Sequence, residues 1–300
     1  MSSITQSSYK QYEVCFKKWW QFCVKNLVDP FNSTVPNIIK FLTEVFINGA
    51  AHSSVNCYRS AIALLNGPEI ATDPRMLRFF KGISKIRPSK PKYDSTWDPK
   101  IVLDYFTSKE NNTELSLKDL SMKLICLLAL VTGHRMQTFS LIRLENIELQ
   151  QDNIEIKIPD PIKTSGPKRS QPVLVLPYFN KNNKVCAAYT LRCYIDKTKD
   201  LRKDIKFLFI STRRPYKAVT AQTLGHWVKE TLEKCGLDTN IFTAHSTRHA
   251  STSTAKKMGI DIDTLRKTAG WTDKSKTFAK FYDLRISVDK SAFANAILNK

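Results

Sequence analysis

Long apolar stretches are absent from this 300-residue sequence. The longest uninterrupted apolar run, Leu124 to Val131, has eight residues, whereas a membrane-spanning helix needs about 18 or more. The first twenty residues carry Lys10, Glu13, Lys17 and Lys18 and lack the apolar core and small-residue cleavage site of a secretory signal. We therefore expect an intracellular protein with no membrane segment.

Glycine and closely spaced cysteines are also scarce. Nine glycines, no low-complexity tract and no internal repeat at solenoid periods favour a compact fold. The seven cysteines are odd in number, and no two lie two to four residues apart as a structural zinc site requires. We expect them to be reduced and mostly buried. They are Cys15, Cys23, Cys57, Cys126, Cys186, Cys193 and Cys235.

Acidic residues are too few to balance the basic ones. The chain has 47 lysines and arginines against 27 aspartates and glutamates, a formal net charge of +20, yet it is 42% hydrophobic. It is too apolar for a disordered basic tail and too basic for an ordinary metabolic enzyme. Residues 1–90 carry a net charge of +7 and residues 91–300 carry +13. Nucleic acid is the partner that fits both parts best, because neutralised phosphates release counterions; lysines that only maintain solubility are the alternative.

A break between two parts occurs near residues 86–99. Pro88, Pro91 and Pro99 exclude a continuous helix there, so residues 87–98 are predicted to be a linker. Upstream, apolar residues at helical spacing predict a small all-helical domain over residues 1–86. Its helices are expected at 5–27, 35–48, 53–65 and 74–84.

The larger part, residues 99–300, mixes two periodicities. Helical patterns cover 99–108 and 117–131 and resume from Ala218 to the C-terminus. Between them, alternation at 154–158 and an apolar run at 173–176 predict two strands joined by a turn, with a third strand at 206–210. The predicted fold class is mainly α with a small antiparallel β-sheet, in two domains.

Two basic motifs are candidates for binding an anion. His245 and Arg248 are three residues apart, so on a helix both side chains can reach one anion. Arg135 follows an apolar helix and the helix-ending Gly133, a place where a guanidinium can be held rigidly. Taken singly, both motifs have a plainer explanation, because most such residues are solvated or cap helices.

Three further positions are equally ambiguous alone. Lys163 lies in the turn between the two predicted strands, where a lysine is usually polar surface but could donate a proton to a leaving oxygen. Tyr282 and Phe278 have the spacing of a packed helix face, so Tyr282 could be a core residue. Trp271 follows a glycine and would by default be a buried aromatic that anchors a turn.

The joint order of these six positions changes the interpretation. It resembles the active-site series of tyrosine recombinases over residues 97–300, and the preceding helical domain looks like that family's core-binding domain. The motifs TGHRMQTFSLI, IKTSGPKRSQPVLVLP, HSTRHASTS and AGWTDKSKTFAKFYD are similar to those of eukaryotic mobile elements of the Crypton and DIRS/Ngaro kind, which implies a nuclear location. The six positions are Arg135, Lys163, His245, Arg248, Trp271 and Tyr282.

This resemblance implies a specific chemistry on double-stranded DNA. Arg135 and Arg248 would clamp the non-bridging phosphate oxygens. Tyr282 would attack phosphorus through its phenolic oxygen and give its proton to His245, and Lys163 would protonate the departing 5′-oxygen. The implied product is a 3′-phosphotyrosine, formed by homodimers or homotetramers on synapsed DNA with no metal or nucleotide cofactor.

Three departures from the family pattern are visible. Gln137 and Thr138 stand where the family usually has a small residue and then Glu, so the shell around Arg135 is expected to differ. The interval from Trp271 to Tyr282 is longer than is commonest. Trp271 stands where many relatives have His; its indole N–H can donate to a phosphate oxygen but cannot carry a proton.

Two alternatives to an active recombinase stay open. A catalytically silent DNA-binding protein derived from such a recombinase would carry the same charge, although the intact catalytic positions favour the enzyme. A metal-dependent nuclease or transposase would need carboxylates converging on two divalent ions, and the acidic residues show no such grouping. A short apolar stripe in residues 287–298 either docks on a neighbouring subunit or packs on its own domain.

Overall fold

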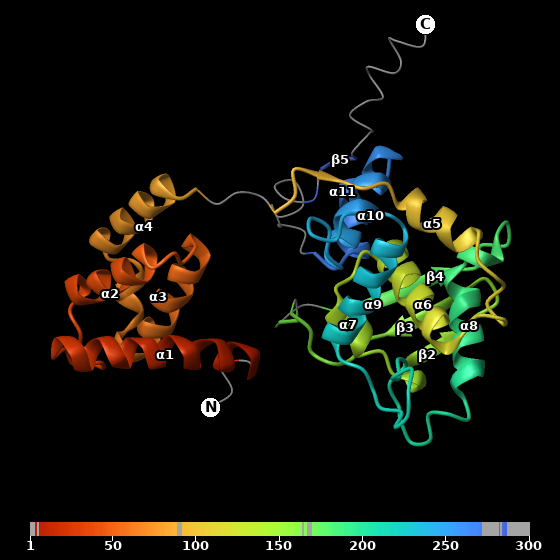
Figure 1. The fold of residues 1–300 in the computed structure, drawn as a ribbon, viewed down its shortest axis with the longest axis horizontal. Coiled ribbons are helices and arrows are strands. Elements are labelled where there is room, and N and C mark those ends of the chain that lie inside the picture. Colours follow the sequence, from red (N-terminus) through yellow and green to blue (C-terminus); the bar gives the residue numbers. More distant parts are fainter. Residues whose placement is uncertain are drawn as a thin grey trace, which may run out of the picture. The chain divides into compact units, whose positions relative to one another are not determined.

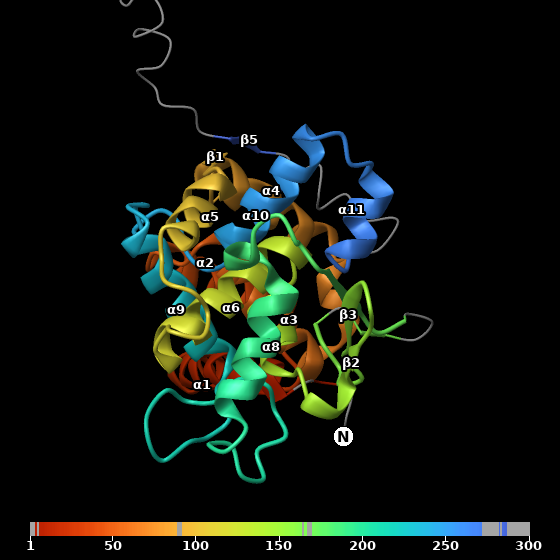
Figure 2. The same cartoon turned by 90° about the vertical axis from the view of Figure 1, so that its right-hand side faces the viewer.

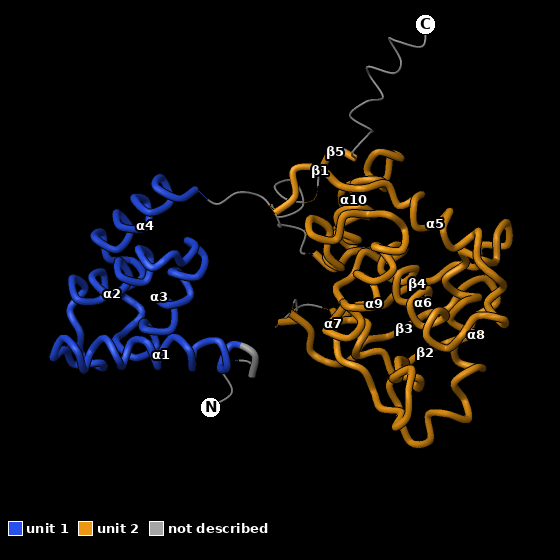
Figure 3. Tube along the Cα trace, in the orientation of Figure 1, with its two compact units in different colours: residues 1–91 blue, residues 92–300 orange. Residues whose placement is uncertain are grey.

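The computed structural model divides the chain into two compact units, residues 1–91 and residues 92–300 (Figure 3). The C-terminal stretch 287–298, with its apolar stripe, lies outside the residues that the structure describes. Within the described part, every helix is too short or too polar to cross a bilayer. The described residues are 4, 6–88, 92–163, 165–166, 170–271, 282 and 284–286 (Figure 1).

The described part of the first unit is helical. Its α-helices lie close to the ranges that apolar spacing predicts. The core of this unit is aromatic: the rings of Trp19 and Phe22 stack with centroids 5.6 Å apart, and Phe41 meets Trp19 edge-on at 5.2 Å. The elements are α1 (Gln6–Asn26), α2 (Val35–Ile47), α3 (His52–Asn66), the 3₁₀ turn η1 (Pro68–Ala71) and α4 (Pro74–Ile86).

The second unit contains the antiparallel sheet that the sequence predicts. Its strand order is β2–β3–β4. Ile154 pairs with Leu176 and Ile156 with Leu174. All four side chains are buried, which explains why the sequence alternates here. The strands are β2 (Ile147–Leu149), β3 (Asn153–Lys157) and β4 (Val173–Pro177).

The prediction of a strand at 206–210 is wrong. Leu208, Phe209 and Ile210 are buried, but the segment makes only isolated bridges, through Phe207 and Ile210. Its apolar character therefore reflects packing in the core, where Phe209 contacts Tyr194 and Trp227, and not pairing within the sheet. The third strand is β2 instead, and the exposed Glu148 and Leu149 leave it without the apolar pattern of a buried strand.

Helix α6 (Leu117–Thr132) lies at the centre of the second unit. It contacts α7 (Met136–Ser140), α8 (Ala187–Thr198), α9 (Ala221–Lys234) and α10 (Ser246–Lys257). Figures 1 and 2 both show α8 and α9 on either side of it. The side chains of α6 are buried continuously from Leu120 to Leu130, which explains the longest apolar run of the sequence.

The end of the described chain is not the continuous helical segment that periodicity predicts. Helix α11 (Ile262–Thr268) is followed later in the chain by strand β5 (Arg285–Ile286). This strand pairs in parallel with β1 (Ser95–Thr96), which precedes α5 (Pro99–Thr107). Tyr282 lies in a turn before β5. This pairing joins the two ends of the unit, and a sequence periodicity confined to one segment carries no record of it.

Gly133 ends α6 in the left-handed conformation, with φ 61° and ψ 16°. Its N–H donates to the carbonyl of Ala129 at 3.1 Å. A glycine suits this cap because a Cβ is strained in the left-handed region. The turn brings His134 and Arg135 directly after the buried helix.

Gly133→Ala is expected to lower the free energy of unfolding by about 1–2 kcal/mol. The alanine would have an unfavourable positive φ, and its Cβ would lie 3.4 Å from Cβ of Ala269. Gly225→Ala in α9 is the matched control, because its Cβ would meet Ala244 at an ordinary 3.8 Å and alanine favours a helix by up to about 1 kcal/mol. Urea unfolding measures both variants, and equal losses would contradict the importance of the left-handed cap.

Candidate active site

Arg248 lies in the first turn of α10 and is 1% exposed. Its Nη1 donates to the carbonyl of Gly133 at 2.5 Å, which ties α10 to the end of α6. Its Nε and Nη2 are buried and have no hydrogen-bond acceptor among the described residues. Burial and then the charge of Arg135 lower the pKa of Arg248 to about 9. A buried cation with unpaired donors is unfavourable unless an anion binds beside it.

Arg135 is the N-cap residue of α7 and is half-buried. Its position follows from the turn at Gly133, which directs the chain from the end of α6 into α7. Its charge lowers the pKa values of both Arg248 and His245. The structure thus brings the two predicted arginines, which are far apart in sequence, to one site.

The hydroxyl of Tyr282 lies 2.8 Å from Nε2 of His245. The backbone carbonyl of Tyr282 accepts a hydrogen bond from Oγ of Ser253 at 2.6 Å. His245 immediately precedes α10 and Ser253 lies within it, so one helix positions both the imidazole and the tyrosine backbone. Tyr282 is 5% exposed and is therefore a packed residue. The contact of its hydroxyl with His245 also makes it a candidate nucleophile.

His245 is held as a neutral base. Desolvation of its ring, and then the charges of Arg248 and Arg135, lower its pKa to about 4. At neutral pH the imidazole therefore carries one proton, and Nε2 can accept a hydrogen bond from the hydroxyl of Tyr282. This geometry suits the transfer of the phenolic proton to His245.

Trp271 packs against the guanidinium of Arg248. The central carbon of the guanidinium lies 3.9 Å from the centroid of the Trp271 rings, and Tyr282 meets Trp271 at 4.8 Å with an interplanar angle of 62°. A cation–π contact of this kind orients the arginine. The sequence interpretation assigned Trp271 hydrogen-bond donation to phosphate; the structure adds this positioning contact.

Lys163 lies at the edge of the site, on the hairpin between β3 and β4. Its side chain is exposed, and its backbone N–H donates to Oε1 of Gln137 at 3.3 Å. Its charge contributes, after those of the arginines and Lys92, to the low pKa of His245. Gln137 departs from the family pattern, and here it connects α7 to the hairpin that carries Lys163.

His249 and Tyr93 are site residues that the sequence interpretation missed. The ring of His249 stacks on that of Tyr282, with centroids 4.1 Å apart and an interplanar angle of 13°. The ring of Tyr93 meets the ring of His249 edge-on, with centroids 4.9 Å apart. The hydroxyl of Tyr93 lies 2.8 Å from Oγ1 of Thr243. The only signal in the sequence is that His249 follows Arg248 and lies four residues after His245.

His134 makes the stability of this site dependent on pH. Burial, and next the charge of Arg248, lower the pKa of His134 to about 4, from the ordinary value of 6.5. An unfolded chain therefore binds this proton first as the pH falls, so stability that is complete above pH 6.5 is lost progressively toward pH 4. The loss in the free energy of unfolding over this pH range amounts to at most about 3 kcal/mol.

We expect His134→Gln to remove part of this dependence. Chemical unfolding at pH 7 and at pH 5 should show a smaller loss of stability at pH 5 for the variant than for the wild-type chain. His226→Gln is the control, since His226 lies on α9 outside the site. Identical losses in His134→Gln and the wild type would contradict the assignment.

No metal cluster or disulfide is found in the part of the chain that the structure describes. All seven cysteines are free thiols there. No group of three or more His, Cys, Asp or Glu side chains among these residues is placed to hold a metal ion.

A family profile matches most of the second unit. The profile of the phage integrase family covers residues 107–286, more than half of the chain. The chain belongs to the phage integrase family. The members of this family are tyrosine recombinases, and the match includes the stretches that hold both arginines, the histidine and the tyrosine of the site.

Solved structures with the fold of this phage integrase family member include three DNA complexes. A lambda integrase dimer (residues 75–356) bound to a COC′ core site has a TM-score of 0.56 at 18% identity, over 96% of this chain and 93% of that one. The Tn1549 transposon integrase in complex with transposon right end DNA has a TM-score of 0.62 at 14% identity, over 99% of this chain and 94% of that one. XerH recombinase bound to difH in a pre-cleavage complex has a TM-score of 0.59 at 16% identity, over 96% of this chain and 78% of that one.

These TM-scores and coverages establish the fold and confirm the predicted class, a mainly helical recombinase fold with a small antiparallel sheet. A comparison with curated proteins gives no significant match. The roles of individual residues in this phage integrase family member therefore rest on the geometry of its own site.

Proposed function

We propose that this tyrosine recombinase is a site-specific recombinase or integrase that cuts and rejoins DNA strands through a covalent 3′-phosphotyrosine at Tyr282. The observation that carries the proposal is the buried guanidinium of Arg248, with two unpaired donors, beside a hydroxyl that is hydrogen-bonded to a neutral histidine. The guanidinium requires an anion, and the nucleophile and its base lie beside it. A DNA phosphate meets all three requirements.

The proposed reaction conserves the energy of the phosphodiester bond. Oη of Tyr282 forms a bond to phosphorus, and the bond from phosphorus to the 5′-oxygen breaks. Nε2 of His245 accepts the phenolic proton, and Lys163 gives a proton to the departing oxygen. A 5′-hydroxyl then attacks the phosphotyrosine and gives its proton to Lys163. The bond from phosphorus to Oη of Tyr282 breaks, and His245 returns its proton to Oη, so the strand is rejoined. No nucleotide or metal ion is required for these steps.

Charge stabilisation is the proposed task of the arginines. Arg135 and Arg248 bind the non-bridging oxygens, where negative charge grows in the transition state. The contact between Gly133 and Arg248 at 2.5 Å fixes one nitrogen of the fork, so Nε and Nη2 remain for the phosphate. Trp271 holds the plane of this guanidinium and donates its indole N–H to a phosphate oxygen.

We assign DNA binding to residues 1–86, catalysis to residues 99–300 and the linker to residues 87–98. Exposed basic side chains on α4, including Arg78, Lys81 and Lys85, support the first assignment. Relatives of the same fold were solved as a dimer on a core site and as a tetramer on a Holliday junction. We therefore propose a homodimer or homotetramer on synapsed double-stranded DNA.

The proposed origin is a eukaryotic mobile element of the Crypton or DIRS/Ngaro kind, with action in the nucleus. The motifs around Arg135, Lys163, His245 and Tyr282 support this origin, because they are similar to the versions found in such elements. A silent, domesticated DNA-binding protein remains the second candidate. The assembled His245–Tyr282 pair favours the enzyme.

A nicked duplex from the ends of the element tests the proposal. A nick near the cleavage site lets the cut fragment diffuse away, so the covalent intermediate accumulates. We expect an adduct that resists SDS, forms equally well in EDTA and maps by peptide sequencing to Tyr282. A chain that binds this duplex yet forms no adduct would support the silent candidate, and an adduct that requires a divalent ion would contradict the mechanism.

DNA affinity is expected to fall steeply with salt. If about six phosphates are neutralised, the association constant should drop about a thousandfold between 50 and 200 mM salt. Fluorescence anisotropy with a labelled duplex measures this slope, and a duplex of unrelated sequence is the control for non-specific binding. A nearly flat response would show that the charge of +20 does not serve DNA binding.

A further inference from the structure

A cavity of about 670 Å³ lies beside the first half of α6, away from the end that carries Gly133. Its walls come from α5 and the segment that follows it, from α6 and from the last turns of α9. The side chains of Phe106, Leu115 and Met122 give it an apolar patch, and charged and polar side chains line the rest. None of the residues assigned to DNA cleavage lines it.

Lys123 of α6 lines this cavity and is 1% exposed. Its Nζ is buried, has no hydrogen-bond partner among the described residues and lies 5.8 Å from the ring centroid of Phe106. Burial, and then the charge of Lys184, lower the pKa of Lys123 to about 8. Because a buried ammonium without a counter-charge is costly, this position calls for an anion.

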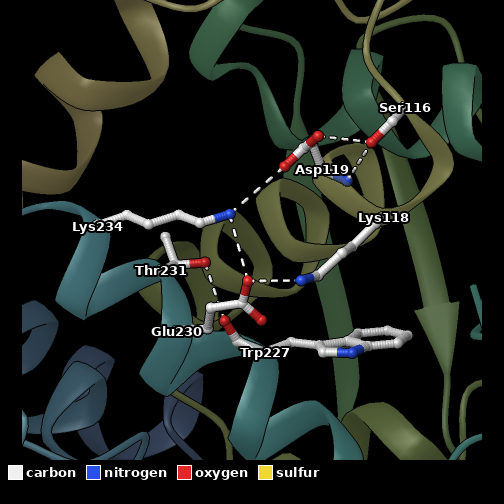
Figure 4. A network of polar contacts seen from close by, with 7 residues as sticks. All are labelled: Ser116, Lys118, Asp119, Trp227, Glu230, Thr231 and Lys234. Atoms are coloured by element: carbon white, nitrogen blue, oxygen red, sulfur yellow. Dashed lines mark hydrogen bonds and ion pairs between the residues drawn. The ribbon is translucent and has the colours of Figure 1, made fainter.

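Asp119, which lines the cavity, and the neighbouring Glu230 are already paired with other lysines (Figure 4). Glu110 also lines the cavity and is exposed. Lys234 lies 3.7 Å from Asp119 and 3.3 Å from Glu230, and Glu230 also pairs with Lys118 at 2.6 Å. Figure 4 shows the amino group of Lys234 between the two carboxylates. This network neutralises its own charges and leaves the ammonium of Lys123 without a carboxylate partner.

We propose that the cavity binds a small organic carboxylate. Its anionic group pairs with Nζ of Lys123, and its apolar body packs against Phe106, Leu115 and Met122. A singly charged anion is favoured over a doubly charged phosphate because one buried ammonium balances one negative charge. The volume is in the range of small-molecule sites and accommodates an aromatic ring. This site goes beyond the proposed function and is independent of it.

Benzoate and its neutral analogue benzamide test the site by titration calorimetry on the whole chain. We expect saturable binding of benzoate, at least about tenfold tighter than that of benzamide, since a charge-assisted hydrogen bond is worth about that factor. Lys123→Met keeps the length and the apolar stem and should lose this preference. Lys109→Met is the matched control, because Lys109 lines the same cavity but is exposed, and it should retain the preference.

No saturable benzoate binding, unchanged binding in Lys123→Met, or equal losses in both variants would overturn the proposal. Should Lys123→Met fail to fold, the pKa of Lys123 in the wild-type chain can be followed by NMR of labelled lysine. A rise in that pKa on addition of benzoate but not benzamide supports the site, and an unchanged pKa overturns it. Neither readout depends on DNA cleavage.

Discussion

Tyr282→Phe is expected to abolish the covalent DNA adduct while DNA binding persists. The phenyl ring keeps the stacking on His249 at 4.1 Å and the contact with Trp271 at 4.8 Å. It lacks only the oxygen that lies 2.8 Å from Nε2 of His245, and without that oxygen no bond to phosphorus can form. The SDS-resistant adduct on the nicked duplex and anisotropy with the same duplex measure the two properties side by side.

Tyr93→Phe is the matched control for this substitution. Tyr93 is also a buried tyrosine beside His249, but its hydroxyl pairs with Thr243 and not with the proposed base. Loss of one neutral hydrogen bond should reduce adduct formation by no more than about tenfold. An adduct that survives in Tyr282→Phe would assign the nucleophile to another residue. Complete loss in both variants would show that the assay reports general damage to the site.

The parts of the fold that the sequence predicts are those in which burial is periodic. In β3 and β4, Ile154, Ile156, Leu174 and Leu176 face the core and their neighbours do not, so alternation marks both strands. Helix α6 is buried on every side and appears as an unbroken apolar run. In each case a local pattern is imposed directly by the environment of the segment.

The parts that escape prediction depend on contacts between distant segments. Strand β1 pairs with β5 through Ser95 and Arg285, and neither two-residue strand is long enough to show a period. The His249–Tyr282 stack likewise joins α10 to a turn near the C-terminus. The six proposed catalytic positions could be named only through a family resemblance. No residue spacing indicates that Arg248 reaches the carbonyl of Gly133.

Arg248→Lys is expected to lower the rate of adduct formation by about a hundredfold or more, with little change in DNA affinity. Removing one donor that stabilises transition-state charge typically costs about 10²–10³ in rate. A lysine keeps the charge, but its single ammonium cannot donate to the carbonyl of Gly133 and also reproduce the planar fork that Nε and Nη2 present. Single-turnover adduct formation and anisotropy separate the rate from binding.

Arg202→Lys is the control that separates catalysis from stability. Arg202 is a buried arginine of the same unit, 5% exposed, and donates to the carbonyls of Phe207 at 2.9 Å and Leu208 at 3.1 Å. Both substitutions remove guanidinium bonds to buried carbonyls, so both should lower the unfolding midpoint. Only Arg248→Lys should slow the reaction of the folded fraction. A wild-type rate in Arg248→Lys would mean that the reacting phosphate does not depend on this guanidinium. An equal loss of rate in a folded Arg202→Lys chain would trace the effect to packing of the unit.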